Sequence, residues 1–295
     1  MQAESMLTRH QIEQYREAGY LVVEDLLTPE QLSELRRVTY DLVAGARGLT
    51  RSDKVYDLED SHRPEAPRVR RIKKPHRLDD LYWQTVRAPN VAAILTQIIG
   101  PNVRLNSSKI NLKAPGYGAA VEWHQDWAFY PSTNQNILAL GVMLDDVDEA
   151  NGPMLVLPGS HRGPIHSHHD ADGFFCGAID PTRGELDFTR AEMVMGRAGS
   201  VSVHHVRLVH GSALNTSARP RAMLLYEARA ADAWPLMGVG DLDEFNALMI
   251  CGQPMEPRLE PVPVRMPVPV RGEPGSIYDY QSAAERRYFD VYRGE

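Results

Sequence analysis

The 295-residue chain has little of several features that define large classes of proteins. Its only two cysteines, Cys176 and Cys251, cannot build the disulfide framework of a small secreted domain. No run of about 18 apolar residues occurs, and the first 20 residues lack the apolar segment of a signal peptide. Repeats with a period of about 20–50 residues are also missing, which excludes solenoids and propellers. We therefore expect a cytoplasmic protein without a membrane partner.

Positive charge is also scarce. The chain has 32 Lys and Arg against 39 Asp and Glu, a formal net charge of −7. Proteins that bind nucleic acid use many Lys and Arg to replace the counterions of the phosphates, so a nucleic-acid partner is not expected. The stretch 68–77, RVRRIKKPHR, is a local exception. It is either a surface loop or a source of side chains that bind an anion, because local potential can oppose net charge.

The periodicity of apolar residues predicts helices in the first third of the chain and strands after it. Thr8 and Thr28 are suited to cap the helices expected over 8–18 and 28–42, and a third helical region covers 78–99. Short strands separated by turn residues then follow. We expect strands over 20–27, 103–113, 121–130, 136–146, 153–160, 200–210 and 221–230. This order predicts a mainly β protein, a sandwich or barrel with a helical buttress on one outer face.

Two segments do not fit this pattern. The polar stretch 160–190 is too long for an idle connection, and loops of that length are usually functional or disordered. The stretch 253–270 carries proline at many alternate positions, which excludes a central strand. We expect it to be an extended edge or a segment that follows the surface.

The stretch Val121–Trp127 holds the most informative residues. On a strand, residues two apart point to the same face, so His124 and Asp126 would lie side by side. These are two of the three ligands in the 2-His-1-carboxylate triad of non-haem Fe(II) oxygenases. His204, His205 and His210 are candidates for the third ligand. If 200–210 is one strand, His204 shares the face of His210, and His205 points away.

A second His-x-Asp, formed by His168 and Asp170, lies in the polar loop. No alternating apolar residues frame it, so its two side chains need not share a face. It is also only 42 residues before His210, whereas His124 is 86 residues before it. We interpret this copy as part of a solvated loop.

Arg221 begins the last predicted strand, 11 residues after His210. A hairpin would place its guanidinium beside a metal but out of bonding range, where it could bind a carboxylate through two hydrogen bonds. Arg219 is a competing candidate. Pro220 separates it from the apolar run, so Arg221 is preferred.

Taken together, these motifs resemble the phytanoyl-CoA dioxygenase (PhyH-like) family of Fe(II)/2-oxoglutarate-dependent dioxygenases. The matching elements are the N-terminal helix with GYLVVEDLLT, then HQD at 124–126, NGPMLVLPGSH at 151–161 and HGSALNTSARPR at 210–221. The resemblance implies a double-stranded β-helix (jelly-roll, cupin-like) barrel. It also implies that His124, Asp126 and His210 bind Fe(II), and that Arg221 holds the distal carboxylate of 2-oxoglutarate.

The resemblance extends to further residues and also has limits. Ser212 matches a family position that helps to hold 2-oxoglutarate, Lys109 falls where relatives contact it, and Arg71 or Lys73 is the counterpart of a family lysine near it. Val142 replaces a tryptophan that several relatives carry beside the cosubstrate, which predicts a wider inner wall. The acyl-CoA substrate that names the family does not transfer, because family does not fix substrate.

The resemblance implies that the enzyme uses O2 to hydroxylate an unactivated C–H of a small metabolite, releasing succinate and CO2. Asp126 favours hydroxylation over halogenation, because related halogenases have a small residue there. One alternative is a cupin-like binding protein without turnover, but such a protein would not need Arg221 together with all three ligands. Another is a zinc hydrolase, but that function would not explain the presence of Arg221. The sequence does not indicate an oligomeric state.

Because residues 124, 126 and 210 span the β-rich part, one barrel must contain them. We therefore predict a single domain over 1–295, with a helical part over 1–100, the catalytic barrel over 101–250 and a proline-rich extension over 251–295.

Overall fold

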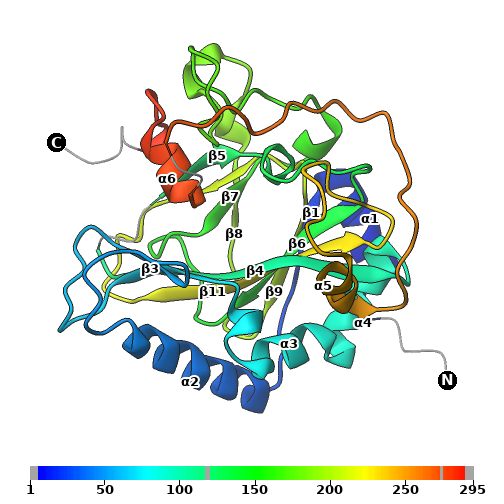
Figure 1. Ribbon diagram of the computed structural model, residues 1–295. Coiled ribbons are helices and arrows are strands. Elements are labelled where there is room, and N and C mark those ends of the chain that lie inside the picture. The colour runs from blue at the N-terminus through cyan, green and yellow to red at the C-terminus, as the bar shows by residue number, and fades with distance from the viewer. Residues whose placement is uncertain (1–5, 117–119, 273–274, 290–295) are drawn as a thin grey trace.

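A computed structural model describes residues 6–116, 120–272 and 275–289. Two antiparallel sheets lie face to face, and helices cover the outer face of the larger one (Figure 1). This arrangement confirms the mainly β fold with a helical buttress.

The larger sheet has the strand order β1-β9-β6-β11-β4-β3-β2, with β12 paired to β4. Its strands are β1 (Tyr20–Val23), β2 (Tyr56–Leu58), β3 (Val69–Lys73), β4 (Val103–Lys113), β6 (Ile137–Met143), β9 (Val201–His205), β11 (Arg221–Ala230) and β12 (Met249–Cys251). The smaller sheet has the order β5-β10-β7-β8. Its strands are β5 (Val121–His124), β7 (Met154–Val156), β8 (Glu192–Val194) and β10 (His210–Ser212).

The helices begin where the sequence provides caps. The α-helices are α1 (Arg9–Ala18), α2 (Pro29–Gly45), α3 (Asp80–Arg87), α4 (Pro89–Ile99), α5 (Leu242–Ala247) and α6 (Ile277–Ser282). Thr8 and Thr28 each form a capping box with the glutamine three residues later. The helical region predicted over 78–99 is divided at Pro89, whose ring disfavours helical backbone at Ala88 and which has no N–H to donate.

The two faces of the larger sheet bury different sets of side chains. Directly paired residues of antiparallel strands share a face, so Leu224 and Val142 point one way and Leu225 and Gly141 the other. Val142 packs in the cluster that includes the helices, whereas Leu225 packs between the sheets. The prediction that Val142 lines the inner wall is therefore wrong by one position, because Gly141 occupies that face.

Two predicted strands are broken at the point where the chain changes sheets. The stretch 200–210 is not one strand: β9 belongs to the larger sheet and β10 to the smaller one, with a turn over 206–209 between them. The stretch 121–130 likewise ends as a strand at His124, and the short 3-10 helix η2 (Asp126–Ala128) follows. Apolar residues continue through both breaks, so the sequence pattern alone does not reveal them.

The basic stretch and the proline-rich stretch have defined places. Half of the basic stretch, Val69–Lys73, forms β3, which is an inner strand of the larger sheet and not a surface loop. The proline-rich stretch runs extended over the surface toward α6, as predicted (Figure 1). Its Pro263 carbonyl accepts a hydrogen bond of 3.0 Å from the Trp127 indole. Within the described ranges, no helix combines the length and the apolar character that a membrane crossing requires.

Candidate metal centre

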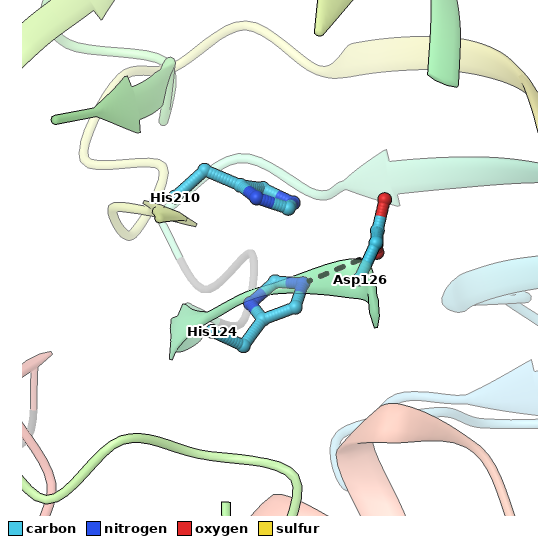
Figure 2. A group of neighbouring side chains, drawn as sticks. All are labelled: His124, Asp126 and His210. Atoms are coloured by element: carbon cyan, nitrogen blue, oxygen red, sulfur yellow. Dashed lines mark ion pairs between the residues drawn. The ribbon is translucent and has the colours of Figure 1, made fainter. Parts of the chain in front are cut away.

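Three side chains that can ligate a metal meet between the two sheets (Figure 2). One ligand atom each from His124, Asp126 and His210 lies within 4.8 Å of the other two, and all three residues are buried. His210 on β10 lies directly opposite His124 on β5, which brings the two rings together with centroids 4.1 Å apart. Asp126 follows at the start of η2, with Oδ1 3.7 Å from His124 Nε2. A cross-strand pair and the turn after it thus build the cluster.

Backbone carbonyls fix the tautomer of both histidines. The Nδ1 of His124 is 2.8 Å from the Glu122 carbonyl oxygen, and the Nδ1 of His210 is 2.9 Å from that of Leu208. A carbonyl oxygen only accepts, so each Nδ1–H donates, and in the neutral form of such a ring Nε2 carries the free lone pair. Metal-binding histidines are commonly oriented in this way.

The charge states of the cluster also suit a divalent cation. Burial alone would raise the pKa of Asp126, but its interactions with His124 and His204 hold it well below the usual range. Burial lowers the pKa of the His210 imidazole well below its ordinary value, and the neighbouring His124 and His204 add to this. An ionised carboxylate and neutral imidazoles are the forms that bind metal. Two imidazoles and one carboxylate are the ligand set of non-haem Fe(II) oxygenases.

A third histidine faces the cluster from the larger sheet. His204 on β9 is 1% exposed, and its Nε2 lies 3.4 Å from Asp126 Oδ2. Neither of its ring nitrogens has a hydrogen-bond partner among the described residues. His205 points the other way, as predicted, with its ring near those of Tyr15 and His161.

A cavity of about 60 Å³ adjoins the cluster and is rich in positive charge. The alternation along β4 turns Lys109, Asn111 and Lys113 toward it, and Arg221 of β11 lies directly opposite Lys113. Arg71 of β3 lies opposite Asn111 and also lines the cavity. Four cationic side chains of this acidic protein therefore share one small space.

Arg221 and Lys113 are buried together at one end of the cavity. They are 3% and 2% exposed. The Arg221 guanidinium donates to the Gly152 carbonyl over 2.5 Å, and the Lys113 ammonium donates to that of Ala213. Burial lowers the pKa of Arg221 to about 10 and that of Lys113 well below its ordinary value, which Arg221 lowers further. Two adjacent buried cations favour the binding of an anion.

Of the other residues predicted to bind the cosubstrate, some line the cavity and one does not. Ser212 and Lys109 line the cavity, and the Lys109 ammonium also pairs with Glu227 over 2.8 Å. Lys73 does not reach the cavity: its ammonium lies 2.6 Å from an Asp57 carboxylate oxygen. Arg71 is the residue of the basic stretch that lines the cavity instead. Its Nε donates a hydrogen bond of 3.1 Å to the Asn111 side-chain oxygen.

Sequence reasoning missed three residues of this site. Alternation from Lys109 was a sufficient signal for Asn111 and Lys113. Tyr278 of α6 also lines the cavity, with the Arg71 guanidinium 5.0 Å from its ring centre, and no local pattern announces it. His168, expected in a solvated loop, is instead 2% exposed and contacts the peptide that links the cluster residues His124 and Asp126.

The comparisons with known proteins agree with this chemistry. The family model described as Phytanoyl-CoA dioxygenase (PhyH) matches residues 15–223. A probable alpha-ketoglutarate-dependent hypophosphite dioxygenase of Stutzerimonas stutzeri is 37% identical over 94% of this chain and 98% of its own length. An ectoine dioxygenase of Bordetella parapertussis is 30% identical over 73% of each chain.

Solved structures show the same fold. The crystal structure of EctD from S. alaskensis with 2-oxoglutarate and 5-hydroxyectoine has a TM-score of 0.67 at 23% identity, over 88% of this chain and 89% of that chain. These neighbours have the double-stranded β-helix fold. The chain therefore belongs to the phytanoyl-CoA dioxygenase (PhyH) family and is an iron- and 2-oxoglutarate-dependent dioxygenase.

Proposed function

We propose that His124, Asp126 and His210 hold the Fe(II) of this dioxygenase. The observation that carries this assignment is the meeting of one carboxylate and two tautomer-fixed imidazoles within 4.8 Å beside a cationic cavity. Three protein ligands leave room for 2-oxoglutarate and O2, and iron supplies the oxidising chemistry when these are bound. The protein itself orients the reactants and excludes water from the site.

Arg221 and Lys113 are proposed to bind the distal carboxylate of 2-oxoglutarate. The Nε of Arg221 is buried and has no hydrogen-bond partner within the described part of the chain. A planar guanidinium matches a carboxylate, and the adjacent ammonium adds a second charge. Ser212, which lines the same cavity, is suited to donate its hydroxyl to this carboxylate.

The substrate is proposed to be a small anion, with hypophosphite as the first candidate. Two observations support it: the Stutzerimonas stutzeri relative shares 37% identity over nearly its full length, and the cavity is small and cationic. In the balanced reaction, hypophosphite, 2-oxoglutarate and O2 give phosphite, succinate and CO2. One oxygen atom enters a P–H bond, and the other enters succinate.

Hydroxylation of a C–H bond in a small organic acid is the second candidate. It is favoured by the 30% identity to the ectoine dioxygenase of Bordetella parapertussis. Lys109, Arg71 and Asn111 would serve either substrate, because each presents a polar group to the cavity.

The test begins without oxygen. Addition of Fe(II) and 2-oxoglutarate to the protein should give the visible metal-to-ligand charge-transfer band, and O2 should then release succinate. Succinate release should increase most with hypophosphite and yield phosphite, while ectoine and L-proline serve as the organic comparison. Faster release with one of these organic compounds than with hypophosphite would replace the first candidate by the second.

Two aspartates provide a matched pair of variants. Asp126→Ala should abolish both the band and the succinate. Asp170→Ala removes the carboxylate of the other His-x-Asp, which pairs with Arg271, and should leave both unchanged. If the wild-type protein showed neither band nor succinate after iron loading, or if Asp126→Ala retained them, the metal assignment would be wrong.

A further inference from the structure

Gln125, the residue between the two metal ligands of the HQD motif, is held through both its backbone and its side chain. Gln125 is fully buried, with 0% of its surface exposed. Its backbone is extended, at φ −118° and ψ 127°, where the chain leaves β5 for η2. The orientation of this peptide sets how Asp126 lies relative to His124, because each ligand is one residue away.

His168 holds that peptide. Its Nε2 accepts a hydrogen bond of 2.8 Å from the Gln125 backbone N–H, and its Nδ1 donates to the His166 carbonyl oxygen over 2.9 Å. Only the neutral ring with hydrogen on Nδ1 makes both bonds. A buried N–H without a partner is costly, so this imidazole satisfies a requirement created by the end of the strand.

The Gln125 side chain joins the same peptide to two other segments. Its Oε1 accepts from the His166 backbone N–H over 2.9 Å, and its Nε2 donates to the Arg207 carbonyl oxygen over 2.8 Å. Arg207 lies in the turn that leads from β9 to β10 and so to His210. The Trp127 backbone N–H reaches the same turn, donating to the Val206 carbonyl oxygen over 2.9 Å.

We infer that Gln125 and His168 form a clamp that sets the geometry of the metal ligands, and that both are positioning residues. The inference rests on the proposed function, because it takes His124, Asp126 and His210 as the ligands. The clamp connects the turn that carries Asp126 to the turn that precedes His210. It also gives the loop 160–190 a function, since this loop supplies His168.

Metal affinity is the direct measure of this role. We propose to titrate His168→Leu with Co(II), and with Fe(II) in the absence of oxygen, by calorimetry and by the 2-oxoglutarate charge-transfer band. Loss of a residue that orients metal ligands typically lowers affinity about 10–100-fold. We expect a loss in that range and a displaced band maximum. His168→Gln, whose amide oxygen can accept from the Gln125 N–H, should recover most of the affinity.

His169→Leu is the matched control. His169 is also buried in this loop, but its Nε2 contacts the Met266 carbonyl oxygen of the proline-rich stretch, 3.2 Å away. This variant should lose thermal stability without a change in metal affinity. If His168→Leu does not fold, Gln125→Ala removes the side-chain half of the clamp and should weaken metal binding in the same direction.

The outcomes separate this inference from the proposed function. A wild-type protein that binds neither metal nor 2-oxoglutarate contradicts the proposed function. A wild-type protein that binds both, while His168→Leu or Gln125→Ala binds Co(II) with unchanged affinity and spectrum, overturns the clamp. Equal loss of affinity in His168→Leu and His169→Leu would also overturn it, because the effect would then be general destabilisation of the loop.

Discussion

At the scale of single residues, the shape of a cation matters as much as its charge. Arg221 presents a planar fork at the end of the cavity, fixed on one side by the Gly152 carbonyl. Lysine at the same place would keep the charge but lose the second parallel hydrogen bond to a carboxylate. An exchange of Arg for Lys is therefore not conservative here.

We predict that Arg221→Lys weakens 2-oxoglutarate binding about 10-fold or more, because a charge-assisted hydrogen bond contributes about 1.5–3 kcal/mol. The anaerobic charge-transfer band, titrated with 2-oxoglutarate, measures this. Arg219→Lys is the control, since Arg219 is exposed and pairs with Asp148 at the surface. An equal effect of both substitutions would contradict the assignment of Arg221.

A substitution of Lys113 should raise the stability of the protein and at the same time weaken 2-oxoglutarate binding. Its ammonium is buried beside Arg221, and burial with this neighbour lowers its pKa well below the ordinary value. Lys113→Met replaces a buried cation with an apolar chain of similar length. Burial and the neighbouring Arg221 both disfavour the charged ammonium, so its removal relieves an unfavourable interaction in the protein without ligand. We expect a higher melting temperature without ligand and weaker 2-oxoglutarate binding; a lower melting temperature with unchanged binding would contradict this.

At the scale of elements, the turn before β7 supports the cosubstrate end of the cavity. Asn151-Gly152 stands between β6 and β7, at the turn predicted from the sequence, and Gly152 has a φ of +79°. A Cβ there would lie 2.7 Å from the Ala213 carbonyl oxygen and 2.7 Å from the Lys113 side chain. The glycine is thus required by both its conformation and the close approach of Lys113.

We predict that Gly152→Ala destabilises the protein by more than the about 1–2 kcal/mol that left-handed backbone costs an alanine, and also weakens 2-oxoglutarate binding. Gly173→Ala is the control: Gly173 has a φ of +88°, and no atom of the described residues lies within 4 Å of the place that a Cβ would take. Gly173→Ala should therefore lower the free energy of unfolding only by the cost of left-handed backbone for an alanine. Urea denaturation and the charge-transfer titration measure the two effects; equal destabilisation by both substitutions would contradict the steric argument.

The elements also show what periodicity predicts. The strands expected over 103–113 and 221–230 have the observed bounds of β4 and β11, because both lie within the larger sheet for their whole length. The strand expected over 200–210 is divided, because the chain changes sheets at 206–209. Apolar residues occupy both the strand and the turn, so burial is predictable from them but the direction of the chain is not.

At the scale of the whole molecule, the proposed metal ligands and Arg221 could be predicted from sequence. Their residue types and spacing match the chemistry of a metal site with a carboxylate-binding arginine beside it. Alternation also placed His204 on the face of His210. Tyr278 and the burial of His168 could not be predicted, because each depends on which segments the fold brings together. We propose that residues 1–295 form a single domain: one buried cluster extends from Leu7 to Ile250. Cytoplasmic location remains a prediction.

The net charge of the molecule conceals an internal separation of charge. The chain carries −7 in total, yet Arg71, Lys109, Lys113 and Arg221 line one cavity. Asp126 lines the same cavity and Glu227 pairs with Lys109, but several other carboxylates pair with surface arginines. Positive potential focused in a cleft raises the local concentration of anions, so substrate association should become slower as salt increases.

Buried histidines should make the whole molecule sensitive to acid. Burial lowers the pKa of His168 and His205 to about 3 and that of His76 to about 4. Unfolded histidine has a pKa of about 6.5. Between these values the unfolded chain binds protons that the folded chain does not, so stability is fully present above about pH 6.5 and declines as the pH falls below it.

We predict that the urea midpoint, measured with a chelator present, falls steadily from pH 7 to pH 5. The contribution of a fully buried histidine such as His168 rises toward about 1.4 kcal/mol per pH unit as the pH falls below the unfolded pKa of about 6.5. Asp126 does not contribute to this decline between pH 7 and pH 5. Its pKa is lowered in the folded protein, so the stability that its ionised form provides is lost only below about pH 4. His168→Gln should make the decline shallower by about one proton per molecule. A midpoint that does not change between pH 7 and pH 5 would show that these imidazoles are protonated in the folded protein.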